Sequence, residues 1–116
     1  MNNLIYLYLF HLLVIAPLFI YVGYNKKNIN NYIFLSLLVL GIINLTYHLY
    51  LVYNYYNKFK FINHLNIMHI LFVAPLLIYI GYFKNDTPSI YLDYLFIMGL
   101  GLALYFIYKL FKIYNL

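Results

Sequence analysis

Four long apolar stretches, separated by short polar segments, run through this chain at about residues 4–24, 32–53, 62–83 and 88–111. About 20 consecutive apolar residues in a helix are enough to cross the hydrocarbon core of a bilayer. Pro and Gly occur inside the stretches, as they do in membrane helices. Thr87-Pro88 is a typical helix start, with Thr as the capping residue. The pattern predicts an all-α integral membrane protein with four spans.

The apolar pattern also repeats itself. Residues 11–28, HLLVIAPLFIYVGYNKKN, and residues 69–86, HILFVAPLLIYIGYFKND, are alike at a spacing of 58, with ten identities in the first sixteen positions. Biased composition does not easily place His, Pro, Gly and Lys in register, so we interpret the halves 1–58 and 59–116 as a tandem repeat of a transmembrane hairpin. Each hairpin crosses the membrane twice, so the two repeats are parallel. Together they are expected to form one domain, a four-helix bundle with an interior.

Composition strengthens the membrane assignment. The chain is 67% hydrophobic and 8% charged, with a mean hydropathy of +0.85. A soluble domain of this length needs far more polar surface. It has no Cys, which excludes disulfides and thiolate chemistry. Seven Lys against two Asp give a net charge of +5, but the lysines flank the apolar stretches. The expected partner is therefore the lipid bilayer and not a nucleic acid.

Charge and tyrosine positions bear on orientation. Tyrosines gather near both ends of the apolar stretches, as an aromatic belt at each interface would require. The side that carries the N-terminus has four lysines and the opposite side has three; these are Lys58, Lys60, Lys109 and Lys112 against Lys26, Lys27 and Lys84. This small bias predicts that both termini lie in the cytoplasm.

Three histidines are predicted to lie at a similar depth, roughly 8–11 Å from one interface at 1.5 Å per helical residue. His11 and His69 begin the two repeat copies, and His48 lies near the end of the second stretch, which runs the other way. Asn44 shares a helix face with His48, and Asn66 shares one with His69. The sequence thus predicts one polar layer of three imidazoles and two carboxamides.

Three interpretations of this layer stay open. Neutral imidazoles can hydrogen-bond across helices and hold them together, which needs no cofactor. Ionisable groups at membrane depth also mark proton or ion paths. A metal or haem site is the third: His11, His48 and His69 would suit zinc or copper, and His11 with His69 could be axial haem ligands. The only acids are Asp86 and Asp93, away from the layer, so we expect no enzyme.

Prolines and small residues are expected to shape the helices. Pro17 and Pro75 lie at equivalent mid-helix positions, where each removes a backbone hydrogen bond and should kink its helix. The residues predicted to allow close helix packing are Gly41, Gly99, Gly101 and Ala103. The spacing Gly99-x-x-x-Ala103 fits the small-xxx-small pattern, which would close the bundle or join two copies into a homo-oligomer.

The two repeat copies differ in the polar layer. At the spacing of 58, Asn44 and His48 correspond to Leu102 and Phe106. The fourth helix is therefore expected to be apolar where the second is polar, which excludes a symmetric site of four histidines.

The stretch H-x-L-x-x-A-P-L-x-I-Y-x-G-Y, followed by T-Y-H-L-Y in the next helix, resembles small multi-span membrane proteins encoded by large DNA viruses of algae and amoebae. The resemblance covers one hairpin and implies a virion or infected-cell membrane, without assigning catalytic residues. We therefore expect a structural or assembly role in a membrane. The alternative is a proton-conducting, ion-conducting, metal-binding or haem-binding membrane protein that uses the histidine layer.

Overall fold

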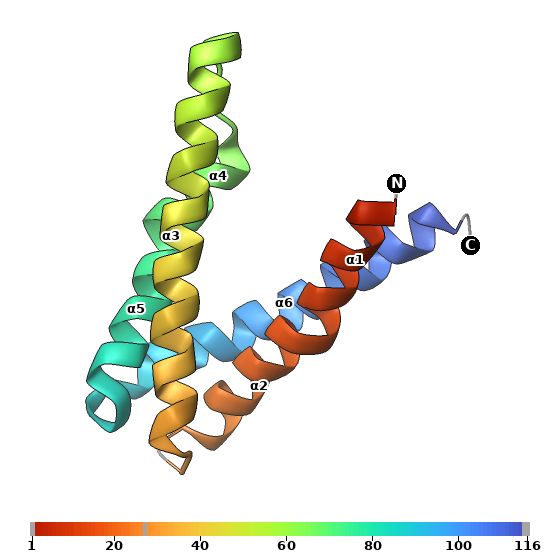
Figure 1. Cartoon of the computed structure of the whole chain (residues 1–116). Helices are drawn as coiled ribbons and strands as arrows, with labels where there is room; N and C mark the ends of the chain where they lie inside the picture. The colour runs from red at the N-terminus through yellow and green to blue at the C-terminus, as the bar shows by residue number, and fades with distance from the viewer. Residues whose placement is uncertain (1, 27, 115–116) are drawn as a thin grey trace. The chain divides into compact units, whose positions relative to one another are not determined.

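A computed structural model describes residues 2–26 and 28–114, and these contain only helices and loops (Figure 1). The predicted all-α class is therefore confirmed. In chain order the elements are α1 (Asn2–Phe10), η1 (His11–Ile15), α2 (Ala16–Asn25), α3 (Asn31–Phe59), α4 (His64–Met68), η2 (His69–Val73), α5 (Ala74–Phe83), η3 (Lys84–Asp86) and α6 (Ser89–Ile113).

The described residues include four helical runs that are long and apolar enough to cross a membrane: Ile5–Asn25, Asn31–Phe59, His64–Asp86 and Ser89–Ile113. They correspond to the four predicted stretches. The second continues past its expected end at residue 53, because no Gly or Pro interrupts the Tyr- and Asn-rich segment that follows. It ends at Phe59, and the next residue, Lys60, has a left-handed φ of 53° and donates its N–H to the Tyr56 carbonyl at 2.8 Å.

Helix starts follow local side-chain chemistry in two of the long helices. Asn30 Oδ1 accepts from the Tyr32 N–H at the start of α3, and Asn63 Oδ1 accepts from the Leu65 N–H at the start of α4, each at 2.8 Å. The expected Thr87 cap of α6 is wrong. Thr87 is buried and its hydroxyl donates to the Ile80 carbonyl at 3.5 Å, so α6 begins at Ser89 without a side-chain cap.

The chain forms two compact units, each a pair of antiparallel helices (Figure 1). Unit 1 consists of Met1–Asn28 and Pro88–Leu116 and pairs α1–η1–α2 with α6. Unit 2 consists of Ile29–Thr87 and pairs α3 with α4–η2–α5. Each unit thus takes one long helix from each half of the sequence, and the predicted hairpins 1–58 and 59–116 are not the packing units.

The two units are packed alike inside. The buried apolar side chains among the described residues form five pairs, each 58 positions apart: Ala16 and Ala74, Phe19 and Leu77, Val22 and Ile80, Phe34 and Leu92, Leu37 and Leu95. Burial of the same positions in both units means that each pair uses the same helix faces. We call the line of contact between the two helices of a unit its seam.

Glycines let the backbones approach closely at one end of each seam. A Cβ at Gly23 would lie 2.5 Å from Phe96 Cβ in unit 1. A Cβ at Gly81 would lie 2.5 Å from the Leu38 backbone nitrogen in unit 2. Because no side chain fits at such distances, only Gly allows this approach. Gly81 corresponds to Gly23, and Phe96 to Leu38, at the spacing of 58.

Candidate functional site

A polar cluster occupies the seam of unit 2, at the end away from Gly81. His48 Nδ1 lies 2.8 Å from Oδ1 of Asn66, which is 6% exposed, and this contact joins α3 to α4. The imidazole of His69, the first residue of η2, stacks on that of His48, with ring centroids 4.2 Å apart and ring planes 20° apart. The structure therefore brings together three of the five predicted layer residues, and we call them the imidazole cluster.

Hydrogen bonding fixes which ring nitrogens carry protons. His69 Nδ1 lies 2.6 Å from the Leu65 carbonyl, and His11 Nδ1 lies 2.8 Å from the Leu7 carbonyl. Carbonyl and carboxamide oxygens only accept, so Nδ1 of His11, His48 and His69 is the donor in each case. In each of these tautomers Nε2 is the ring nitrogen that carries a lone pair, so it can act only as an acceptor.

Asn44 lies one turn from His48 on α3 and is half-buried. Its Oδ1 is buried and has no hydrogen-bond partner among the described residues. A buried carboxamide oxygen without a donor costs free energy, and such a group needs a water or ligand donor to satisfy it. Asn44 therefore extends the polar part of the unit 2 seam by one turn.

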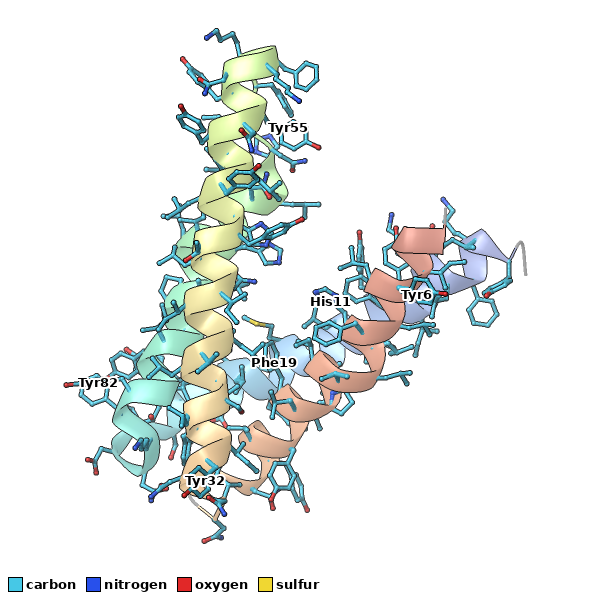
Figure 2. All side chains as sticks on the ribbon, viewed as in Figure 1. Tyr6, His11, Phe19, Tyr32, Tyr55 and Tyr82 are labelled. Atoms are coloured by element: carbon cyan, nitrogen blue, oxygen red, sulfur yellow. The ribbon has the colours of Figure 1, made fainter. Side chains whose placement is uncertain are left out.

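Unit 1 carries an aromatic cluster at the equivalent positions. Phe106 stands where unit 2 has His48, and Tyr8 stands where it has Asn66. The Phe106 ring lies 4.9 Å from the His11 ring and 5.5 Å from the Tyr8 ring, measured between centroids. His11, labelled in Figure 2, thus lies in an aromatic environment in unit 1, whereas the other two layer histidines stack on each other in unit 2.

Both repeat histidines begin a π-helical turn, a feature that the sequence pattern does not predict. The turns are His11–Ile15 and His69–Val73, and each precedes a proline by one residue. Pro17 and Pro75 lie in the first turn of α2 and α5. Proline has no N–H, so a shift of the bonding register before it accommodates the lost donor. A π-helical turn that begins with a histidine therefore precedes each proline at which a kink is predicted.

The predicted packing residues separate into two groups. Gly41 and Gly99 lie in the seams, where a Cβ would come within 2.8 Å of Ile78 and 2.9 Å of Ile20 respectively. Gly99 thus serves packing within unit 1. A Cβ at Gly101 would meet nothing within 4 Å, and Ala103 is half-buried.

Charged side chains lie at the helix ends. Lys26 Nζ pairs with Asp93 Oδ1 at 3.0 Å in unit 1. Three other lysines lie over tyrosine rings one turn earlier, at 5.1–5.5 Å from the centroid: Lys60 over Tyr56, Lys109 over Tyr105 and Lys112 over Tyr108. All three follow an i, i+4 spacing, a signal in the sequence that could have identified them.

Ring geometry limits what the imidazole cluster can bind. A metal ion lies in the plane of each ligating imidazole at about 2.0–2.1 Å from the nitrogen. The rings of His48 and His69 are nearly parallel and stacked, so their in-plane lone pairs do not converge on one ion. Among the described residues, no three His, Asp or Glu side chains gather into a potential metal site. Comparison with protein-family models, curated proteins and solved structures finds no match to this chain.

Proposed function

We propose that this chain is an integral membrane protein with a structural or assembly role and no enzymatic activity. The observation that supports this proposal is the apolar surface of its long helices. Leu13, Phe72 and Leu104 are 66–70% exposed, and many other large apolar side chains are exposed along the same helices (Figure 2). Exposure of such a surface to water would cost free energy, whereas contact with the hydrocarbon of a bilayer would not.

The helix ends fit the interfaces of a bilayer. Tyrosine rings and lysine ammonium groups are both favoured in the headgroup region of a bilayer. A lysine that lies over a tyrosine one turn earlier places both groups in this region. Lys60, Lys109 and Lys112 have this arrangement at the ends that we assign to the cytoplasmic side. On the opposite side, Asp93 partly neutralises Lys26. This difference in charge favours cytoplasmic termini.

The shared seam positions support an origin by tandem duplication, because two unrelated helix pairs would not by chance bury five pairs of residues at a spacing of 58. We further propose that the four helices form one bundle in the membrane. The resemblance to small membrane proteins of large DNA viruses favours a virion or infected-cell membrane as the site of this role.

Helix cohesion is the role that the hydrogen bonds favour for the histidines. Only His48 makes a hydrogen bond to another helix among the bonds described, through Asn66. His11 and His69 donate to carbonyls of their own helix, so their contribution across the seam is ring stacking. A proton wire needs each Nδ1 proton to move onward, but amide and carbonyl oxygens do not carry it further. These acceptors weigh against proton conduction.

A ligand-binding or ion-handling role is the second candidate. Its supporting observation is the Asn44 oxygen, which is buried without a donor one turn from His48. Elemental analysis and an absorption spectrum of the purified protein would detect a bound metal or haem.

Tags on the two termini test the membrane proposal. In sealed vesicles, protease should digest both tags or protect both, because four spans return the chain to its starting side. Digestion of one tag with protection of the other would refute four spans. Release of the protein from membranes by alkaline carbonate would refute integral insertion.

A further inference from the structure

We propose that the imidazole cluster is a recognition site within the chain: the hydrogen bond between His48 and Asn66 determines which helix binds the seam face of α3. This inference goes beyond the structural role and does not depend on membrane insertion. It rests on a comparison of the two seams, which have equivalent glycine contacts and differ in the cluster.

The apolar contacts of the two seams are interchangeable. Gly41 approaches Ile78 in unit 2, and Gly99 approaches Ile20 in unit 1; the two contacts correspond at the spacing of 58. At the glycine of each seam end, the nearest atoms of the facing helix are backbone or Cβ atoms, which every residue except Gly supplies. Apolar packing alone therefore does not decide whether α3 pairs with α5 or with α2.

The ring contacts of the cluster do not decide it either. His48 stacks on His69 in unit 2, and Phe106 lies against His11 in unit 1. His11 and His69 are equivalent positions, so α3 would meet a histidine ring there in either pairing. Stacking is therefore available to both arrangements.

The position three residues earlier distinguishes the two pairings. Asn66, which is 6% exposed, accepts from His48 in unit 2, whereas Tyr8 packs on Phe106 at the equivalent place in unit 1. Pairing within each half of the sequence would place Asn66 against Phe106, whose side chain has no polar atom. The carboxamide would then be buried without this hydrogen bond, which costs free energy. A buried polar residue selects the partner helix in the same way in coiled coils.

The test exchanges the deciding residues between the seams and reads the pairing by NMR. The full-length protein in detergent micelles is labelled at glycine and isoleucine, and nuclear Overhauser contacts between them are recorded. The observed pairing joins Gly41 to Ile78 and Gly99 to Ile20. Pairing within each half would instead join Gly41 to Ile20 and Gly99 to Ile78.

The double exchange His48→Phe with Phe106→His should reverse the pairing. The composition of the chain is unchanged, but the histidine that binds Asn66 then stands on α6. A hydrogen bond between membrane helices changes such an equilibrium by about 3- to 20-fold, so the contacts of within-half pairing should become the stronger set. The matched control adds Tyr8→Asn and Asn66→Tyr to the same variant. This fourfold exchange moves the polar pair into unit 1, and the observed pairing should return.

A second double exchange keeps the proposal falsifiable if the first does not fold. Tyr8→Asn with Asn66→Tyr changes the other two helices and should also favour within-half pairing. The proposal is overturned if the contacts of the observed pairing stay the stronger set in a folded double exchange, or if the fourfold variant does not restore them. It is also overturned if the fourfold variant folds and neither double exchange does, because the chain would then be unable to choose the matching helix.

Discussion

Replacement of Gly81 by Ala should separate the helices of unit 2. The added Cβ would lie 2.5–2.7 Å from the backbone nitrogen, Cβ and Cα of Leu38. Two of these atoms belong to the backbone of α3, so a change of side-chain rotamer cannot relieve the overlap. Overpacking of this kind costs about 1–3 kcal/mol, and the rigid neighbour places this site near the upper end. Ala gains about 1 kcal/mol of helix propensity over Gly. We expect a net loss of about 2 kcal/mol.

Gly101→Ala is the matched control, because a Cβ there meets nothing within 4 Å. The helix-propensity gain should then stand alone, so this variant should be as stable as the wild type or up to about 1 kcal/mol more stable. Gly23→Ala should behave like Gly81→Ala, because its Cβ would lie 2.5–2.7 Å from Phe96. Unfolding in detergent, followed by circular dichroism, measures all three. A Gly81→Ala protein as stable as Gly101→Ala would refute the close approach.

Three further perturbations test other parts of the fold. Pro17→Ala and Pro75→Ala should each convert the preceding π-helical turn to regular α-helix and change the stability of the protein by similar amounts. Hydrogen exchange would detect the change of turn and thermal melts the change of stability. An effect at only one of the two sites would contradict the equivalence of the two prolines. Asn63→Ala should cost about 1 kcal/mol, measured in the same melts, because it removes the cap of α4. Asp93→Asn should cost less than about 1 kcal/mol, and this cost should shrink further on adding salt, because Lys26 and Asp93 are both well exposed and salt screens exposed ion pairs.

The sequence was sufficient to predict the four helices. Their length and hydropathy leave few alternatives, and only the end of the second helix was misplaced, by about two turns at Phe59. Helix pairing was not predictable. If 1–58 and 59–116 are similar hairpins, each first helix finds the same complementary face on either second helix. Local pattern therefore cannot distinguish pairing within a half from pairing between halves.

Three of the five residues of the predicted polar layer lie together in the structure. The i, i+4 relation and the depth estimate correctly placed His48 near His69 and Asn66, which the hydrogen bond and the stack now join. Depth alone could not show that His11 faces Phe106, because depth says nothing about which helices are neighbours. The π turns were also hidden, since Pro17 signals only a lost donor and not the register shift that compensates for it.

Unit 1 is built from two segments that lie far apart in the sequence, and this has a consequence for folding during synthesis. Unit 2 is a contiguous segment and its two helices can pair soon after residue 87 is made, whereas the first helix of unit 1 must wait for α6. At about 5–20 residues per second, the roughly 60 residues between them take about 3–12 s to synthesise. During this time the close-approach face around Gly23 lacks its native partner, Phe96 of α6. Nascent chains are therefore most exposed to wrong partners, including each other, before their last helix emerges.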